Sequence, residues 1–175
     1  MPMTLLLGGA RSGKSDLAAR LAASSGRPVV YVATAEGRDE EMTERISRHR
    51  EARPPSWRTV EEPSALAPSI RGLPPEAFVV VDCLSLWVSN VMEAGASEDE
   101  ILREARDAAT TLAARARSSV VVSNEVGLGI VPVNELARRY RDVLGRVNVV
   151  FAAAATDAFL VVAGKALPLV EPSLA

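Results

Sequence analysis

Hydrophobic positions along the chain follow two patterns, short apolar runs and longer stretches with helical spacing. The short runs have the length of buried strands, and most are rich in the β-branched residues that favour sheets. The expected strands are residues 5–7, Pro28–Thr34, Phe78–Asp82, Ser119–Asn124 and Ala158–Ala163, with a weaker candidate at Trp57–Val60. Continuous apolar strands of this kind are typical of a sheet that is covered on both faces.

Helices are expected between these runs. They are the segment after residue 15, Asp39–Ala52, Ser64–Ile70, Leu84–Met92, Ser97–Arg117 and Asn134–Ala155. In the last of them, apolar residues recur at three- and four-residue intervals, as on one face of a helix. Alternating strands and helices predict crossover connections and a mainly parallel, doubly wound α/β sheet with helices on both faces. Ligands of such sheets bind at the carboxyl ends of the strands.

Length and composition narrow the class of protein. The 175 residues suit one α/β domain spanning 1–175, and 48% hydrophobic with 4% aromatic residues fits a sheet under alanine-rich helices. A net charge of −2 gives no general attraction to nucleic acid or to an anionic membrane. The single cysteine cannot form an internal disulfide, and the first residues lack the pattern of a secretion signal. From the charge we expect no nucleic-acid partner, and from the cysteine and the first residues a cytoplasmic location. Because Val147–Gly164 is interrupted by polar residues, we expect no membrane span.

The segment between the first strand and the first helix, GGARSGKS, fits the phosphate-loop pattern G-x-x-x-x-G-K-[ST]. Its candidate nucleotide contacts are Gly8, Gly9, Ala10, Arg11, Ser12, Gly13, Lys14 and Ser15. Glycines let backbone N–H groups turn toward phosphate oxygens, and the following helix adds its positive end. Lys14 is expected to reach the outer phosphates and Ser15 to hold Mg²⁺. The alternative is a simple Gly/Ser turn, but the flanking strand and helix favour the phosphate loop.

Asp82 ends an apolar strand well downstream of this loop. Phosphate-loop proteins place at such a strand end the acid that binds Mg²⁺, directly or through water. The alternative is that Asp82 caps the helix that follows it. Given the phosphate loop, we favour the metal role.

His49 is the only histidine, and it lies in an arginine-rich segment. If this segment is helical, Arg45, His49 and Arg53 share a face, although Pro54 puts Arg53 at or beyond the helix end. An imidazole among guanidinium groups is suited to meet a polyphosphate. The alternative is that these side chains only interact with the backbone carbonyl groups of the last helical turn, as arginine and histidine commonly do there.

Other conspicuous residues have ordinary structural interpretations. The arginines at 138, 139, 141 and 146 fit a solvated helix face, and Glu61 and Glu62 fit surface acids near a turn. Cys83 fits a small buried residue at a strand end, and Trp57 and Trp87 fit the core.

Several segments taken together resemble one family, the bifunctional adenosylcobinamide kinase and adenosylcobinamide-phosphate guanylyltransferase of cobalamin synthesis. They are GGARSGKS (8–15), YVATA (31–35), ISRHREARP (46–54), WRT (57–59), DCLSLW (82–87) and NEVGLGIVP (124–132). The similarity continues through GRVN (145–148) and so runs over nearly the whole chain. Its central and C-terminal motifs are far more specific than a phosphate loop.

The resemblance implies a RecA-type phosphate-loop fold, a homotrimer, a corrinoid substrate, and GTP or ATP with Mg²⁺. It implies phosphorylation of the aminopropanol hydroxyl of adenosylcobinamide, followed by transfer of GMP from GTP to that phosphate through a guanylyl group on His49. The implied nucleotide contacts beyond the phosphate loop are Ala33, Thr34, Ala35, Arg50, Glu51, Ala52, Arg53 and Glu61, with Asp82 near the metal.

The chain departs from the family in two places. Val149 stands where a glutamine is usual, and the residues past Lys165 form a short divergent tail, which affects subunit or corrinoid contacts rather than the nucleotide site. Three other functions are also known for proteins with a phosphate loop, and the sequence fits each of them less well. A signalling GTPase needs an N-K-x-D or T-K-x-D segment, which the sequence lacks. A RecA-like DNA-dependent ATPase fits the net charge poorly, and a monofunctional small-molecule kinase leaves His49 unexplained.

Overall fold

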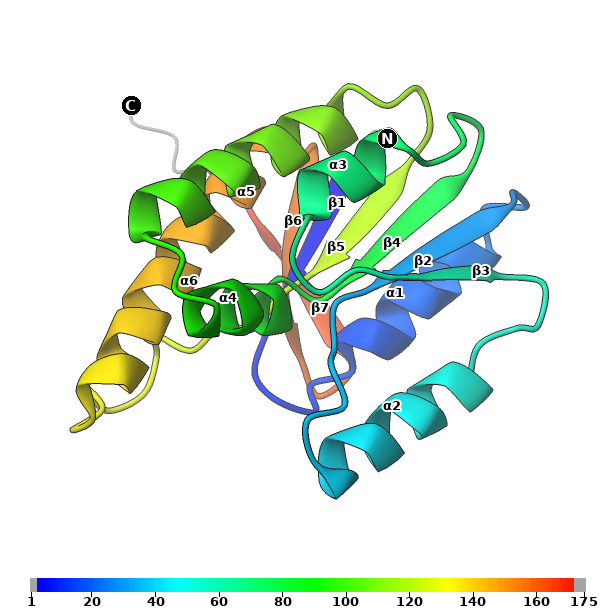
Figure 1. Ribbon diagram of the computed structural model, residues 1–175. Coiled ribbons are helices and arrows are strands. Elements are labelled where there is room, and N and C mark those ends of the chain that lie inside the picture. The colour runs from blue at the N-terminus through cyan, green and yellow to red at the C-terminus, as the bar shows by residue number, and fades with distance from the viewer. Residues whose placement is uncertain (1–2, 172–175) are drawn as a thin grey trace.

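The computed structural model describes residues 3–171, and within them it contains seven strands and six helices (Figure 1). In chain order these are β1 (Met3–Leu7), α1 (Lys14–Ala23), β2 (Val29–Ala33), α2 (Glu40–Glu51), β3 (Arg58–Glu61), α3 (Leu66–Arg71), β4 (Phe78–Asp82), α4 (Leu84–Glu93), α5 (Glu98–Ala113), β5 (Ser119–Val122), α6 (Glu135–Ala154), β6 (Asp157–Val162) and β7 (Lys165–Leu169). Every expected strand and helix is present, with ends that differ by a few residues.

The strands form one sheet in the order β3-β2-β4-β5-β1-β6-β7. Neighbouring strands run parallel except for β7, which is antiparallel to β6. The mainly parallel, doubly wound sheet is therefore confirmed. The strand that precedes the phosphate loop lies inside the sheet, and β5 separates it from β4, the strand that ends in Asp82.

Helices cover the two faces of the sheet unequally (Figure 1). One face packs against α3, α4, α5 and α6 in a large core that includes Trp87, Leu144 and Phe151. The other face carries α1 and a smaller core around Ala18, Ala22 and the strands beneath them. In Figure 1, α2 stands clear of the other helices and is joined to the body by the loops at its two ends.

Three helix starts expected from the sequence have the side-chain caps that their residue types favour. Asp39 accepts from Met42 N at 2.7 Å, and Asn134 accepts from Ala137 N at 3.1 Å. Ser97 and Glu100 form a reciprocal capping box at the start of α5. Because these bonds are local, the sequence was enough to place the helix starts.

The end of the described chain corrects one expectation. The sequence predicts residues 158–163 as the last strand, with a divergent tail beyond Lys165. In the structure β7 follows and pairs with β6 along the sheet edge. The turn between these two strands also supports the phosphate loop, because Gly164 N donates to Ser12 O at 2.8 Å. Within residues 3–171, no helix is long and apolar enough to cross a membrane.

The sheet register brings the ends of five strands into line. Glu61 pairs with Ala33, Ala33 with Asp82, Asp82 with Val122, and Val122 with Leu6. This row lies at the carboxyl edge, where parallel sheets bind ligands. Neighbouring strands are about 4.8 Å apart, so Asp82 and the end of β1 are separated by only one intervening strand.

Candidate nucleotide-binding site

The phosphate loop connects β1 to α1 and wraps around the ammonium group of Lys14. Lys14 is only 6% exposed, and its Nζ donates to Gly8 O at 2.9 Å and to Gly9 O at 2.7 Å. Gly13 precedes α1 with a φ of 92°, a left-handed conformation that glycine adopts readily. The helix therefore begins directly at the loop, and its positive end faces the place where an anion would bind.

Gly8 has no room for a side chain. A Cβ at this position would lie 2.3 Å from Val161 O and 2.8 Å from Ser12 Oγ. We expect Gly8→Ala to displace the start of the loop, to destabilise the protein by about 1–3 kcal/mol and to weaken nucleotide binding. Thermal unfolding with and without GTP measures both effects. Gly9→Ala is the matched control for stability, because a Cβ there meets nothing within 4 Å; equal melting temperatures for the two variants would contradict the prediction.

Two adjoining cavities form one cleft at the carboxyl edge of the sheet. The first, of about 660 Å³, lies between α2 and the ends of β2, β3 and β4, and the second, of about 500 Å³, lies over the phosphate loop. Both are lined by Ser15, His49, Asp82, Cys83 and Leu86. The cleft therefore joins the phosphate loop, the acid of β4 and the histidine of α2.

Most of the site residues expected from the sequence line this cleft. They are Ala10, Arg11, Ser12, Gly13, Lys14, Ser15, Ala33, Ala35, His49, Arg50, Arg53, Glu61 and Asp82. Five others lie outside the lining: Gly8, Gly9, Thr34, Glu51 and Ala52. Gly8 and Gly9 contribute carbonyl groups to Lys14, whereas the Glu51 carboxylate accepts from Ser47 at 2.9 Å. Their predicted roles in nucleotide binding stay predictions.

Helix α2 presents Met42, Ile46 and His49 toward the cleft at four- and three-residue spacing. His49 is in the last turn and is exposed, as are most of the described side chains of the helix. Arg50 forms an exposed ion pair with Glu61 at 3.4 Å, which ties the helix only weakly to β3. Arg53 lies beyond the helix end, so it does not extend the helical face of His49. The side chain of Arg45 is outside the described part of the structure.

Asp82 is half-buried, and its Oδ2 accepts a hydrogen bond from the hydroxyl of Tyr31 on β2. Burial, together with the nearby Asp82 carboxylate, raises the pKa of Tyr31 far above its usual value, so this hydroxyl keeps its proton. The N-cap of α4 is Cys83, without a side-chain cap. Asp82 therefore does not cap that helix, and its carboxylate faces the cleft instead.

The oxygen groups at the cleft suit a magnesium ion. The Ser15 hydroxyl and the Asp82 carboxylate line both cavities. Magnesium prefers oxygen ligands and is commonly held by one or two protein groups, with phosphates and water completing its shell. Across the described residues there is no cluster of three or more His, Cys, Asp or Glu that could hold a metal unaided. The residues present thus fit a magnesium ion that arrives with a nucleotide.

Cys83 follows Asp82 and is buried. Burial is the main cause that raises the pKa of its thiol to about 11. Its backbone is held by Thr34, whose Oγ1 donates to Cys83 O at 2.7 Å and accepts from Cys83 N at 2.8 Å. A protonated, buried thiol is a poor nucleophile, so Cys83 fits the structural role expected for it.

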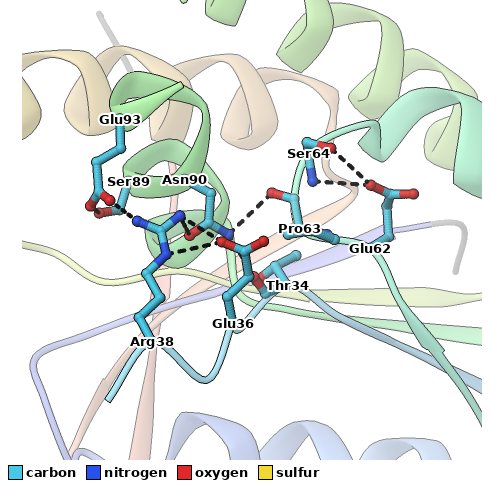
Figure 2. Close-up of polar contacts among 9 residues, drawn as sticks. All are labelled: Thr34, Glu36, Arg38, Glu62, Pro63, Ser64, Ser89, Asn90 and Glu93. Carbon is cyan, nitrogen blue, oxygen red and sulfur yellow. Dashed lines mark hydrogen bonds and ion pairs between the residues drawn. The ribbon is translucent and has the colours of Figure 1, made fainter. Parts of the chain in front are cut away.

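Figure 2 shows how the segment before α2 and the segment after β3 are fixed to α4. Asn90 is 8% exposed, and its Nδ2 donates to Thr34 O at 2.7 Å and to Pro63 O at 3.1 Å. Its Oδ1 accepts from Arg38 at 3.2 Å, and Arg38 is also paired with Glu36 and Glu93. One amide thus links the segment after β2 to the segment after β3. Helix α2 lies between these two strands in the sequence.

Asn90→Ala should destabilise the protein by about 2 kcal/mol, because two carbonyl groups lose a buried donor. It should also raise the KM for nucleotide, since Thr34 and its neighbours line or support the cleft. Chemical denaturation and steady-state kinetics test the two effects. Ser89→Ala is the matched control on the same helix, because it removes one exposed bond to Glu93 and should cost under about 0.5 kcal/mol. Equal losses in the two variants would contradict this role.

The sequence predicts no role for three residues of this region, although Tyr31 and Asn124 lie in segments that resemble the family. Tyr31 and Asn90 act through contacts with residues 51 and 56 positions away, respectively, and Asn124 lines the cavity over the phosphate loop. Tyr31 had a detectable signal, because it is the aromatic residue of an otherwise aliphatic strand and shares a face with Ala33. Asn90 lies within a helix among ordinary neighbours and had no such signal.

A parallel sheet with a phosphate loop, and with an acid and a histidine across the same cleft, defines a phosphate-loop enzyme acting on nucleotides. A family model described as cobinamide kinase / cobinamide phosphate guanyltransferase matches residues 4–169. The chain therefore belongs to this family and is a bifunctional kinase and guanylyltransferase.

Known relatives agree with this assignment. The chain is 44% identical to the bifunctional adenosylcobalamin biosynthesis protein CobP of Pseudomonas aeruginosa, over 94% of this chain and 95% of the relative. It is 41% identical to the bifunctional adenosylcobalamin biosynthesis protein CobU of Escherichia coli K12, over 93% and 96%. Among solved structures, the KaiC-like protein PH0186 from Pyrococcus horikoshii OT3 matches with a TM-score of 0.53 at 15% identity, covering 91% of this chain and 70% of that chain. The last similarity concerns the fold alone, and it agrees with the predicted α/β fold with a mainly parallel sheet.

Proposed function

We propose that this enzyme phosphorylates the aminopropanol hydroxyl of adenosylcobinamide and then transfers GMP from GTP to the new phosphate through His49. The products are adenosylcobinamide-GDP and pyrophosphate, in the assembly of adenosylcobalamin. The kinase and guanylyltransferase activities belong to the family. The covalent route and the individual residue roles are the proposal.

The observation that supports it is the shared cleft. His49 lines both the cavity over the phosphate loop and the cavity beside β2, β3 and β4. A nucleotide whose phosphates lie on the loop therefore occupies the same space that the imidazole faces. Because α2 is joined to the body mainly through its end loops, small changes in those loops can alter the reach of His49.

In the guanylyl step, a neutral imidazole nitrogen attacks the α-phosphorus of GTP. The N–P bond forms as the bond from this phosphorus to the bridging oxygen breaks, and pyrophosphate leaves with that electron pair. Lys14 and the arginines of the cleft offset the negative charge on the non-bridging and leaving oxygens. Metal bound by Ser15 and Asp82 would supply further charge neutralisation on the phosphates.

In the second half, an oxygen of the corrinoid phosphate attacks the same phosphorus and the N–P bond breaks, which returns the electron pair to the imidazole. Two successive in-line displacements give net retention of configuration at phosphorus. The kinase step is a single transfer of the terminal phosphoryl group to the substrate hydroxyl. It depends mainly on alignment and charge stabilisation by the phosphate loop.

Several further parts of the proposal concern partners. Mg²⁺, GTP for the guanylyl step and ATP or GTP for the kinase step are the expected ligands. A homotrimer is proposed from the family resemblance, and exposed apolar side chains on the loop after β5, among them Leu128 (83%) and Ile130 (98%), are surface that subunit contacts could bury. Light scattering after size-exclusion chromatography tests the trimer. A cytoplasmic location stays a prediction.

Mass spectrometry tests the covalent route. The protein is incubated with GTP and Mg²⁺ in the absence of corrinoid, and its intact mass should increase by one guanylyl group. Peptide mapping should place the group on His49, and the adduct should be labile to acid and stable to alkali. Turnover with inverted configuration at phosphorus and no modified enzyme would overturn the proposal.

A further inference from the structure

A single tyrosine ring connects the acid of β4 with the arginine that follows α2. Tyr31 is 3% exposed, and its hydroxyl donates to Oδ2 of Asp82. The guanidinium carbon of Arg53 lies 3.7 Å from the centre of the Tyr31 ring. Asp82, which accepts from the hydroxyl, and Arg53, which lies over the ring, both line the cleft described above.

The hydroxyl has a consequence for the Asp82 carboxylate. The Tyr31 hydroxyl donates to one of the two oxygens of this carboxylate, Oδ2. A carboxylate at the end of a strand can otherwise rotate about its side-chain bonds. The bond from Tyr31 therefore fixes the orientation of the carboxylate and leaves Oδ1 for another ligand.

The ring has a second consequence, for Arg53. This arginine lies beyond α2 and donates to Thr59 Oγ1 at 3.3 Å, in addition to its contact with the Tyr31 ring. The ring is itself supported by Trp57, with centroids 6.4 Å apart and an interplanar angle of 24°. A cation over an aromatic face is stabilised by the electrostatics of the ring. Arg53 is thus held against residues of β2 and β3, although it lies only two residues beyond the helix that carries His49.

Packing alone accounts for the ring but not for the hydroxyl. A phenylalanine at position 31 would fill the same space against Trp57 and Arg53. The hydroxyl instead adds a charge-assisted bond to Asp82, the acid at the end of β4, which β5 separates from the strand that leads into the phosphate loop. Tyr31 belongs to the smaller core, on the face of the sheet that carries α1, and not to the large core.

We propose that Tyr31 is a positioning residue with two separable effects: its hydroxyl orients Asp82 toward the metal of the metal–nucleotide complex, and its ring holds Arg53 beside the nucleotide. The inference rests on the proposed function, because it assumes the metal role of Asp82. No step of the reaction passes through Tyr31 itself.

Substitutions separate the two effects. Tyr31→Phe removes the hydroxyl and keeps the ring, whereas Tyr31→Leu removes both. Tyr140→Phe is the matched control, because it also removes a tyrosine hydroxyl from a partly buried site, where the bond goes to Ser85 O at 3.1 Å and not to an acid. Thermal unfolding of all variants shows which differences come from stability alone.

The main readout is metal binding without turnover. Mn²⁺ replaces Mg²⁺, and electron paramagnetic resonance follows its binding to the protein saturated with a GTP analogue that has a methylene group between the α- and β-phosphates. We expect Tyr31→Phe to raise the Kd for Mn²⁺ about five- to tenfold, as for loss of one hydrogen bond to a charged group. Affinity for the analogue without metal should stay unchanged in Tyr31→Phe and fall in Tyr31→Leu.

Kinetics supply a second readout that lost stability would not reproduce. In Tyr31→Phe, the Mg²⁺ concentration for half-maximal kinase activity should rise by a similar factor, with kcat at saturating Mg²⁺ within about twofold of the parent enzyme. A purely structural role would lower the active fraction and leave the Mg²⁺ requirement unchanged.

Asp82→Asn distinguishes the possible failures. If this variant binds Mn²⁺ as tightly as the parent protein, the metal role in the proposed function is wrong, and the inference about Tyr31 is overturned with it. If Asp82→Asn weakens Mn²⁺ binding and Tyr31→Phe behaves like Tyr140→Phe, the metal role stands and the positioning role of Tyr31 is overturned.

Discussion

His49→Ala is expected to abolish guanylyl transfer while leaving measurable kinase activity. In the proposed mechanism the imidazole forms the bond to the α-phosphorus, and a methyl side chain offers no replacement nucleophile. The kinase step needs the phosphate loop and alignment of the substrate hydroxyl, neither of which uses the histidine. The exposed position of His49 in the last turn of α2 means that its removal leaves no cavity in the core.

Two radioactive labels measure these activities separately. GTP labelled at the α-phosphate should leave label on the parent protein and none on His49→Ala, a loss of at least about 10³-fold if only background remains. GTP or ATP labelled at the γ-phosphate should still label the corrinoid. Ser47→Ala is the matched control on the same helix, since its hydroxyl bonds to Glu51 on the exposed surface. GMP transfer that persists in the His49 variant would rule out the proposed intermediate.

The separation of activities also depends on how α2 is held. Its described side chains pack little against the body, and its two ends are fixed by Asn90 and Arg38 on one side and by Arg53 on the other. Because the helix is attached mainly at its ends, its position can change the reach of His49 without changing the phosphate loop. His49 is needed in the proposed guanylyl transfer and not in the phosphorylation. We therefore expect substitutions in these attachments to change guanylyl transfer more than phosphorylation.

The parts of the fold that local chemistry decides could be predicted from the sequence. The residue types of Gly8–Ser15 are themselves enough to predict the phosphate loop. Ser97 and Asn134 indicate helix starts, because each accepts a bond from a backbone group three residues away. The strands of the sheet interior are continuous apolar runs because both of their faces are covered. Each of these signals lies within a few residues of the feature that it predicts.

The rest depends on contacts between distant segments. The edge strand β7 has five exposed residues and includes Pro168, so neither alternation nor β-propensity marks it, and it forms by pairing with β6. The alignment of strand ends from Glu61 on β3 to Leu6 on β1 depends on the order of the strands in the sheet, which could not be predicted from the sequence. The contact of Arg53 with the Tyr31 ring could not be predicted either, because the four-residue spacing predicts that this arginine shares a helical face with His49.

Lys14 is expected to be the residue on which both activities depend most. In the described structure its ammonium group lies within the phosphate loop, 2.9 Å from Gly8 O and 2.7 Å from Gly9 O. Phosphates bound by the loop, as proposed, would approach this group and the N-terminal end of α1. One ammonium–phosphate pair at roughly 4 Å and an effective dielectric of about 20 is worth about 4 kcal/mol before desolvation. Part of that energy stabilises charge that develops only during transfer.

Lys14→Ala should therefore lower kcat/KM for phosphorylation and for guanylyl transfer by about 10²- to 10³-fold each, a loss of roughly 3–4 kcal/mol of transition-state stabilisation. The sequence holds one other lysine, Lys165, which is exposed at the start of β7. Lys165→Ala removes the same formal charge from the same molecule and is the matched control. Both rates and nucleotide affinity are measured for the two variants, with thermal unfolding as the check on folding. Undiminished kinase activity in Lys14→Ala would show that the phosphates lie elsewhere in the cleft, because a charge buried in the loop cannot be lost without effect if the loop binds them.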